Sequence, residues 1–338
     1  MKLAPSLDMR FLILCLLVIS TGFNSNVNAA EPQRIAPSSS KNIAYLVSDT
    51  RIPFWSLMAK GVQDKAKLQG HTVTIYSSNN DAKRELENTF RAIQQNVDGI
   101  IISPTSSLAA LALIKFAKKA NIPVVISDIG VNSNDYVSYI SSDNKNGAYQ
   151  LGKLLSKKML EHDWAKGSVG IIAIPQKRAN GRARTAGFMQ AINEDGIKAA
   201  GISQQASFSY QETYDFSMAF ITQNPNLRAI WLQGSNRYQA ACDAIMDAGK
   251  LGEILLVSFD AEPIFLKLIP QGILAGSAMQ QPYLMGQNAM DAMGNHLRGK
   301  AVNKEVKVPV LVISEDNMDR HIGTIKRNVF GMGAILKE

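Results

Sequence analysis

The sequence predicts an α/β protein made of two similar lobes, each built on a doubly wound parallel sheet, joined by a multi-strand hinge. Segments with strand and helix patterns alternate from residue 43 onward, which is typical of a parallel sheet with right-handed crossovers. The same alternation restarts near residue 168. One helix and one strand remain after the second series, too little for another domain. Because they must complete the first two lobes, we expect the chain to cross between lobes more than once.

The first series opens with an apolar strand and the helix that covers it. The near-continuous apolar run at 43–48 suits a strand buried on both faces, and apolar residues of 54–69 recur at helical spacing. Asp81 and Asp143 stand where they can cap the helices that follow them. The other strands are expected at 71–76, 99–103, 122–127 and 136–141, and the other helices at 81–95, 108–120 and 143–161.

The second series repeats this order. Its strands are expected at 168–174, 202–208, 227–232, 253–259 and 273–279, and its helices at 182–194, 211–223, 235–248 and 263–269. A helix at 283–297 and a Val-rich strand at 306–313 are left over. We therefore expect an N-terminal lobe of residues 41–142 and 281–310 and a C-terminal lobe of residues 143–280 and 311–338.

Residues 1–29 have the three-part pattern of a secretory signal peptide. Lys2 and Arg10 precede the apolar run 11–19, and small residues around Ala29 offer a cleavage site. The apolar run is shorter than the roughly 20 residues that span a bilayer. We expect an exported, soluble, periplasmic protein from which this peptide has been removed.

The cysteine count and the charge distribution of the exported chain limit which disulfides it can form and which class of partner it binds. Cys242 would be its only cysteine, so no intramolecular disulfide is possible and the core must hold the fold. The formal net charge is +8, but the basic residues are spread along the chain and interleaved with acids. That distribution does not favour nucleic-acid binding, and we expect a monomer whose ligand is a small molecule.

Enzyme motifs are missing from the sequence. There is no Gly-x-Ser-x-Gly elbow, no His-Glu-x-x-His, no Gly-x-x-x-x-Gly-Lys loop, and no Gly-x-Gly-x-x-Gly after a strand. The four histidines are scattered, and no metal-ligand spacing occurs. We expect neither catalysis, nor a cofactor, nor a bound metal.

Polar and aromatic residues follow many of the expected strands, at the sheet edge where open α/β proteins bind ligands. Carboxylates, amides and a guanidinium suit a molecule with several hydroxyls, and aromatic faces suit the C–H side of a sugar ring. Asp128 and Asp260 could instead cap the helices that follow them, and Phe54 or Trp55 could belong to the core. The candidate ligand-binding residues are Ser48, Phe54, Trp55, Asp128, Arg182, Phe208, Asn236, Asp260 and Gln280.

Six short motifs, in this order and spacing, resemble the ribose-type periplasmic binding proteins, which share a fold with lactose-repressor-type effector domains. The resemblance covers residues 41–314. The motifs are IAYLVSDTRIPFW (43–55), IPVVISD (122–128), SSDNKNG (141–147), RARTAGF (182–188), LVSFD (256–260) and AMQQP (278–282).

The resemblance implies a two-lobed receptor that closes by hinge motion around a sugar or sugar-like molecule and delivers it to an ABC transporter permease. An alternative is a receptor that docks on a membrane sensor kinase or chemoreceptor, with the tail at 315–338 as one candidate contact. Matched position by position, the family's ligand contacts fall on the candidates named above, with Asn236 replacing an Asn that would fall on Gly234.

Two other positions depart from the ribose-type pattern. Ile52 stands where the family has Asn, and Ile129 where it has Arg, so ribose itself is not the expected ligand. Basic residues near Arg182, among them Arg178 and Arg184, would favour an anionic ligand if they pointed inward. Long cationic side chains usually lie exposed, and we expect these to lie at the rim of the cleft.

Overall fold

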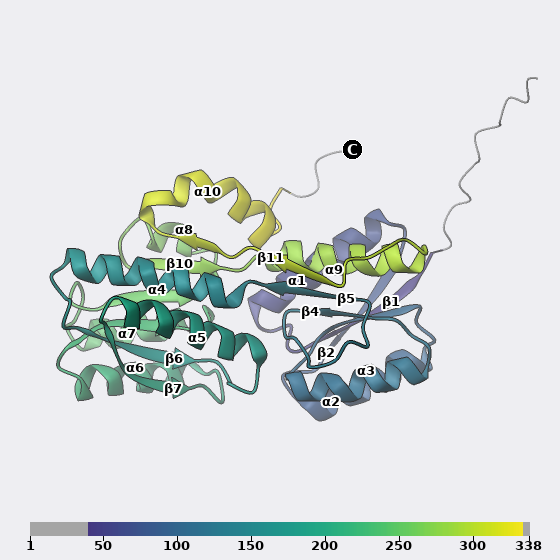
Figure 1. Cartoon of the computed structure of the whole chain (residues 1–338), viewed down its shortest axis with the longest axis horizontal. Coiled ribbons are helices and arrows are strands. Elements are labelled where there is room, and N and C mark those ends of the chain that lie inside the picture. Colours follow the sequence, from purple (N-terminus) through teal and green to yellow (C-terminus); the bar gives the residue numbers. More distant parts are fainter. Residues whose placement is uncertain (1–39, 334–338) are drawn as a thin grey trace, which may run out of the picture. The chain divides into compact units, whose positions relative to one another are not determined.

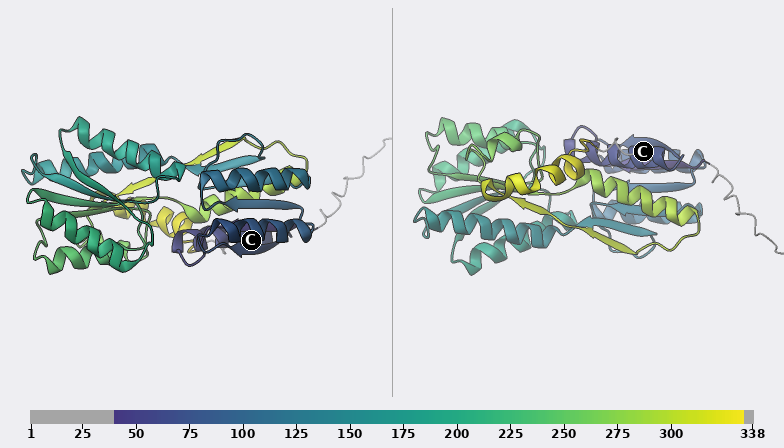
Figure 2. Two further views of the ribbon diagram at one scale, coloured as in Figure 1. Left: turned by 90° about the horizontal axis from the view of Figure 1, so that it is seen from below. Right: turned by 90° about the horizontal axis from the view of Figure 1, so that it is seen from above.

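The computed structural model describes residues 40–333 and contains two six-stranded sheets. The predicted signal peptide, residues 1–29, lies outside the described residues, as does the end of the tail beyond residue 333. The strand order is β2-β1-β3-β4-β5-β11 in the first sheet and β7-β6-β8-β9-β10-β12 in the second. Both sheets are doubly wound, as the sequence predicts. We call each sheet with its covering helices a lobe (Figures 1 and 2).

The N-terminal lobe has parallel strands throughout. Helices α1 and α9 cover one face of its sheet, and α2 and α3 the other (Figure 2). Its strands are β1 (Asn42–Val47), β2 (Thr72–Ser77), β3 (Gly99–Ser103), β4 (Val124–Ser127), β5 (Ser138–Ser142) and β11 (Glu305–Val308). Its helices are α1 (Pro53–Leu68), α2 (Ala82–Gln94), α3 (Ser107–Lys119) and α9 (Pro282–Leu297).

The C-terminal lobe repeats this plan and ends in one antiparallel strand, β12. Its strands are β6 (Ser168–Ala173), β7 (Lys198–Gln204), β8 (Leu227–Leu232), β9 (Leu255–Phe259), β10 (Gly276–Met279) and β12 (Leu311–Ile313). Its helices are α4 (Asn144–Glu161), α5 (Ala179–Glu194), α6 (Tyr210–Gln223), α7 (Tyr238–Asp247), α8 (Phe265–Leu268) and α10 (Met318–Thr324), with short turns η1 (Glu315–Asn317) and η2 (Ile325–Val329).

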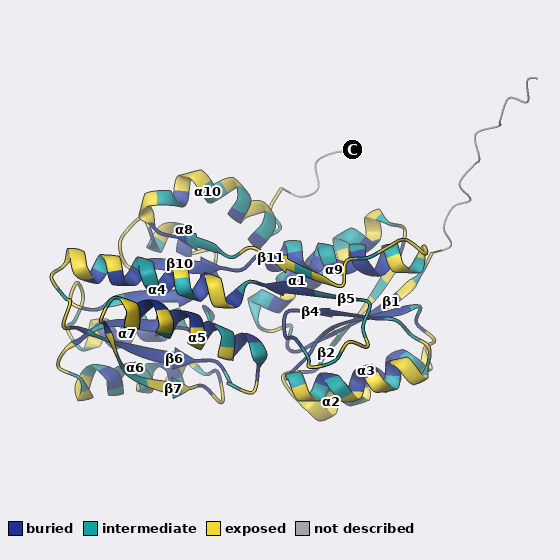
Figure 3. Ribbon diagram, viewed as in Figure 1, coloured by how far each residue is buried: buried dark blue, intermediate teal, exposed yellow. Residues whose placement is uncertain are grey.

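Strand β1 shows why the sheets are buried on both faces. Ile43, Tyr45 and Val47 pack on the side of α1 and α9, whereas Ala44 and Leu46 pack on the side of α2 and α3. Successive side chains of a strand point to opposite faces, so only a continuous apolar run can fill both cores. Figure 3 shows the result as buried strands at the centre of each lobe.

The helices that cover each sheet approach closely at glycines. A Cβ on Gly286 of α9 would lie 2.1 Å from the carbonyl oxygen of Met58 in α1. In the other lobe, a Cβ on Gly187 of α5 would lie 2.0 Å from the carbonyl oxygen of Lys145 in α4. Both helix pairs therefore pack backbone against backbone, which holds the first turns of α1 and α5 in fixed positions over the ends of their sheets.

The chain passes from one sheet to the other between β5 and α4, between β10 and α9, and between β11 and β12. The last passage corrects the prediction of one strand at 306–313. Pro309 has no N–H to donate to a ladder, and β11 ends just before it. The two halves of the predicted strand thus belong to different sheets.

Other predicted elements agree within a few residues, with one clear displacement. Asp81 and Asp143 cap α2 and α4 as expected, accepting bonds from the N–H groups of Arg84 and Asn146. Strand β7, however, lies at Lys198–Gln204 rather than at the predicted 202–208. It is an edge strand with only partly buried side chains, so its sequence carries no continuous apolar run.

The chain after β12 packs on the C-terminal lobe. Met318, Ile325, Val329 and Phe330 are buried in its core. This part of the tail therefore contributes to the core of the C-terminal lobe. In the described part of the chain, no helix is long and apolar enough to cross a membrane.

Candidate ligand-binding site

A pocket lies between the two lobes at the carboxyl ends of their strands, where doubly wound sheets bind ligands. Its free volume is about 50 Å³, so the lining side chains fill most of it. A wider cavity of about 620 Å³ adjoins it and shares Ile52, Phe208 and Asn236 with its wall. The pocket is lined by Ile52, Phe54, Trp55, Asp128, Ile174, Arg178, Asn180, Arg184, Phe208, Gly234, Asn236, Asp260 and Gln280.

Asp128 and Asp260 occupy equivalent places in the two lobes. Each directly follows the fourth strand of its sheet, β4 or β9, with a left-handed backbone of φ 70° or 71°. The N–H of Asp128 donates to the carbonyl of Ile140, and that of Asp260 to the carbonyl of Ala278, each at 2.9 Å. Neither aspartate caps a helix, so the capping alternative is wrong. The uncommon backbone conformation instead aims both carboxylates into the pocket.

The Asp128 carboxylate is buried and held by donors from both lobes. Trp55 Nε1 donates to one oxygen and Asn180 Nδ2, from α5, to the other, each at 3.2 Å. Burial raises the pKa of Asp128 to about 6, and the neighbouring charge of Arg184 opposes this shift. This carboxyl therefore keeps its proton to a higher pH than an exposed aspartate does.

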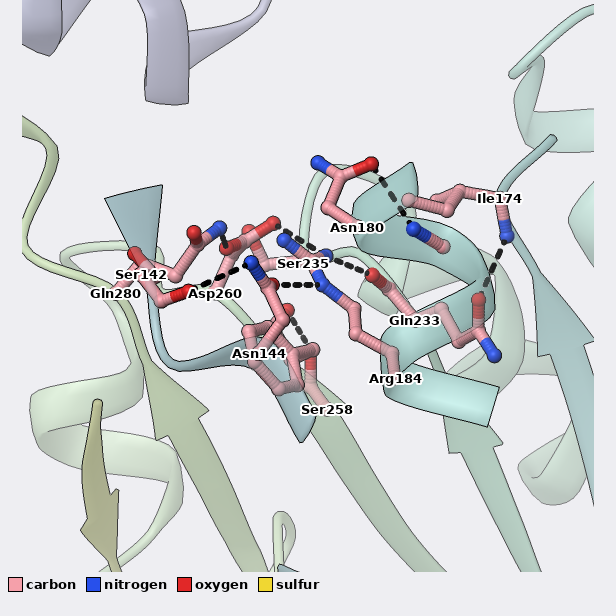
Figure 4. Close-up of polar contacts among 12 residues, drawn as sticks. Ser142, Asn144, Ile174, Asn180, Arg184, Gln233, Ser235, Ser258, Asp260 and Gln280 are labelled. Atoms are coloured by element: carbon pink, nitrogen blue, oxygen red, sulfur yellow. Dashed lines mark hydrogen bonds and ion pairs between the residues drawn. The ribbon is translucent and has the colours of Figure 1, made fainter. Parts of the chain in front are cut away.

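The Asp260 carboxylate anchors a second polar cluster, drawn in Figure 4. Gln280 Nε2 donates to one of its oxygens at 2.5 Å, and Arg184 Nη1 lies 3.5 Å from the other. Arg184 also donates to Asn144 Oδ1 at 2.8 Å and to the carbonyl of Gln233 at 2.6 Å. These bonds fix the guanidinium at the pocket wall. Gln280 Oε1 is buried without a hydrogen-bond partner among the described residues, so it is an acceptor available to a ligand.

Arg184, not Arg182, is the helix α5 arginine in the pocket, and the prediction for Arg182 is wrong. Arg182 is exposed and donates to the carbonyl of Gln176. Successive helical residues turn by about 100°, so two residues apart they point to nearly opposite sides. Helix α5 begins at Ala179, earlier than predicted, and its phase places Arg184 inward.

Arg178 also contradicts the expectation of basic residues at the rim. Its side chain is buried, with its guanidinium carbon 5.2 Å from the centre of the Trp55 ring and 5.7 Å from that of Phe208. It donates to two groups of the opposite lobe, the carbonyl of Thr105 at 3.3 Å and Asn80 Oδ1 at 2.6 Å. Burial lowers the pKa of Arg178 to about 10, which leaves it cationic at neutral pH.

The aromatic candidates line the pocket, but Trp55 also packs in the core of the N-terminal lobe. It is almost fully buried, packs in the core beside α9, and meets Phe54 edge-to-face at 6.1 Å between ring centres. With Arg178 over its ring and Asp128 on its N–H, it is a structural wall of the site. Phe54 is partly exposed, and Phe208 has a positive φ of 55°, uncommon for an aromatic residue.

Ser48 does not reach the pocket, so its predicted placement is wrong. It is fully buried and its hydroxyl donates to the carbonyl of Ser103 at 3.2 Å, which joins β1 to the end of β3. Ile129 is likewise buried in the apolar core of the N-terminal lobe and lines no part of the pocket. Seven of the nine predicted residues line it: Phe54, Trp55, Asp128, Phe208, Asn236, Asp260 and Gln280.

Asn180 and Ile174 were not predicted, and Arg178 and Arg184 were placed at the rim. All four belong to β6, α5 or the loop that joins them, the counterpart of the β1–α1 loop in the other lobe. That equivalence is the signal that could have found them, since the loop after the first strand of each lobe faces the cleft. No cluster of His, Cys, Asp or Glu suited to a metal ion occurs within residues 40–333.

Residues 43–301 match the model of the periplasmic binding protein domain. The chain belongs to this family. The match spans both lobes and every residue of the pocket described above, so the fold of this periplasmic binding protein and its family are established together.

Several curated relatives are similar over most of this periplasmic binding protein. The ribose import binding protein of Haemophilus influenzae is 28% identical over 278 residues, 82% of this chain and 93% of the relative. That of Escherichia coli is 29% identical and covers 79% of this chain and 88% of its own length. The D-allose-binding periplasmic protein of Escherichia coli is 26% identical over 71% of this chain and 79% of its own.

Solved structures share the fold. A periplasmic solute-binding protein of an ABC transporter from Actinobacillus succinogenes, with bound D-allose, superposes with a TM-score of 0.76 at 22% identity, over 83% of this chain and 100% of its own. A solute-binding protein from Bacillus halodurans with bound myo-inositol gives 0.76 at 19% identity, over 85% and 99%. The prediction of a type I periplasmic binding protein fold is confirmed.

Proposed function

We propose that this protein captures a sugar or sugar-like molecule in the pocket between its lobes and delivers it to an ABC importer. One observation carries the proposal: Asp128 and Asp260, at equivalent strand ends of the two lobes, converge on one pocket. The names of the relatives, which are ribose and allose binding proteins, support the same class of ligand.

The polar groups of the pocket suit a molecule with several hydroxyls. Carboxylate oxygens of Asp260 and the unpartnered Gln280 Oε1 can accept hydrogen bonds from hydroxyl groups. Arg184 and Asn236 can donate to hydroxyl oxygens, and Phe54 and Ile52 offer apolar contacts to C–H groups. Ile52 brings no hydrogen-bonding group, so a ligand hydroxyl beside it would lack a partner at a cost of about 1–3 kcal/mol.

Closure of the lobes would transmit the presence of the ligand. The three passages between the sheets can act as a hinge, and a ligand touched by both lobes stabilises the closed state through its differential affinity. Bonds that already cross the pocket, from Asn180 to Asp128 and from Arg178 to Asn80, would add to closure. No chemistry on the ligand is required, and we propose a binding protein without catalytic activity.

The proposed site of action is the periplasm, with the chain exported as a monomer after removal of residues 1–29. N-terminal sequencing of protein recovered from a periplasmic extract would test the cleavage, and light scattering of the purified chain would test the monomer. A mature N-terminus at Met1 would contradict export by a cleaved peptide.

The binding role is tested by calorimetry after a thermal-shift screen of pentoses, hexoses, deoxy-sugars and sugar acids. Replacing Asp260 with Ala removes an acceptor whose hydrogen bonds are each worth about 1.5–3 kcal/mol, so the ligand's Kd should rise at least about tenfold. Asp247→Ala in the same lobe is the control, because Asp247 is exposed and bonds only to Tyr214 among the described residues. An unchanged Kd in Asp260→Ala, with a normal melting curve, would remove Asp260 from the site.

A further inference from the structure

Arg178 is a buried cation without a direct ion pair among residues 40–333, although the carboxylates of Asp128, Glu85 and Asp49 attract it from farther away. It is 4% exposed, and its hydrogen bonds go to neutral acceptors, the carbonyl of Thr105 and the amide of Asn80. It forms no ion pair with a carboxylate of residues 40–333, whereas Arg184, beside it in the pocket, pairs with Asp260. Buried charges are normally paired directly, so a guanidinium at a pocket wall that lacks a direct ion pair favours an anionic ligand.

Arg178 lines the pocket and has hydrogen-bond donors that no described residue uses. A guanidinium has five N–H groups, and here Nε and one N–H of Nη2 are used while Nη1 makes no bond to a described residue. The side chain lines the pocket, and its contacts with Trp55 and Phe208 hold the guanidinium in place. A fixed guanidinium with spare donors is preorganised for a planar, two-oxygen acceptor.

The carboxylates of the pocket are already engaged. Asp128 accepts from Trp55 and Asn180, and Asp260 accepts from Gln280 and lies beside Arg184. Neither forms an ion pair with Arg178, although the charge of Asp128 attracts it at longer range. The ligand is therefore the group that can pair directly with Arg178.

We infer that the ligand is a sugar acid, whose carboxylate binds Arg178 while its hydroxyls bind Asp260 and Gln280 at the other side of the pocket. This inference rests on the proposed function and narrows it from sugars in general to monosaccharide carboxylates. It also fits the apolar Ile52 in the pocket wall, because Arg178 supplies a donor from the opposite lobe instead.

A carboxylate fits better than a phosphate. One guanidinium matches the two oxygens of a carboxylate in a bidentate pair. A phosphate monoester carries nearly two negative charges and would lie in the same pocket as Asp128 and Asp260, with only Arg178 unpaired to compensate it. The repulsion from these two aspartates also limits the favoured ligand to a single negative charge.

The test compares matched sugar pairs by calorimetry: D-galacturonate with D-galactose, D-glucuronate with D-glucose, and D-ribonate with D-ribose. We expect one acid to bind at least about tenfold more tightly than its neutral partner, as a charged hydrogen-bonded pair should. Arg178→Met keeps the length and apolar contacts of the side chain, and should bring the acid's Kd to that of the neutral sugar. Arg178→Lys should retain part of the preference.

Arg182→Met is the matched control, since it removes one positive charge from the same helix region at an exposed position. It should leave both Kd values unchanged, and melting curves of all variants check that they fold. Equal binding of acid and neutral sugar by the natural protein overturns the inference, as does tighter neutral-sugar binding in Arg178→Met, which would make Arg178 an obstruction. If the natural protein binds none of the sugars or sugar acids measurably, the proposed function itself is overturned.

Discussion

Replacing Asp128 with Asn should stabilise the protein against unfolding at alkaline pH while weakening its site. Burial raises the pKa of Asp128 from 3.8 to about 6. A raised carboxyl pKa means that its contribution to stability is fully present below pH 3.8 and is lost as pH rises through about 6. At about 1.36 kcal/mol per pKa unit, ionising the buried group costs about 3 kcal/mol at pH 8 and about 1.6 kcal/mol at pH 5.

Asparagine does not ionise, so the Asp128→Asn variant avoids the cost of ionising a buried group. The free energy of unfolding of this variant relative to the natural protein should therefore increase by about 1.4 kcal/mol between about pH 5 and pH 8. The difference between the two pH values isolates the charge, because an Asn that bonds Trp55 or Asn180 less well lowers stability equally at both. The other charged groups near Asp128, chiefly Arg184, Asp260 and Arg178, are the same in both proteins.

The assay is urea unfolding followed by tryptophan fluorescence at both pH values. Asp135→Asn serves as the control, because Asp135 is exposed and its ion pair with Lys118 is worth at most about 1 kcal/mol. The free energy of unfolding of Asp128→Asn minus that of the natural protein should rise from pH 5 to pH 8, and a difference that stays constant or falls would refute the assignment of a buried, destabilising charge.

Three further changes test the architecture around the site. Glu85→Gln should gain about 2.5 kcal/mol of unfolding free energy relative to the natural protein between about pH 5 and pH 8, measured by urea unfolding, because burial raises the pKa of Glu85 to about 7 beside Thr105. A difference in unfolding free energy that does not change with pH would contradict this. Arg184→Met should destabilise the fold by about 3–5 kcal/mol in the same assay, since it leaves the Asp260 carboxylate without its cation, and unaltered stability would argue against that pair. Gly286→Ala should lower the free energy of unfolding by about 1–3 kcal/mol, because the added Cβ would collide with the backbone of α1. A melting curve like that of the natural protein would show that α1 and α9 can move apart without loss of stability.

Much of the fold follows from local pattern. Strands β3 and β8 lie at the predicted residues, 99–103 and 227–232, because each is an apolar run buried on both faces. The prediction for strand β7 is displaced because this strand lies at the edge of its sheet. Its side chains are only partly buried, so its sequence has no continuous apolar run that marks its position. The prediction at 306–313 joined two strands, since apolar residues flank Pro309 on both sides and pattern alone does not tell which sheet each half joins.

Local sequence is enough to show which strand ends carry polar groups, because alternation of elements places the carboxyl ends of the parallel strands on one edge of each sheet. It could not decide the inward or outward direction of single side chains. The positive φ at Asp128 and Asp260 turns them into the pocket rather than onto a helix, a consequence of their bonds to the neighbouring strands.

Only the tertiary structure separated Arg178 and Arg184 from Arg182. Their identities are the same, so composition and spacing treat them alike, and the difference comes from where α5 starts and from the groups that the opposite lobe presents. Arg178 is buried because Asn80, Thr105 and Trp55 of the N-terminal lobe surround it, residues 73 to 123 positions away in the chain. Contacts at that sequence distance are set by the packing of the two lobes, and no local pattern encodes them.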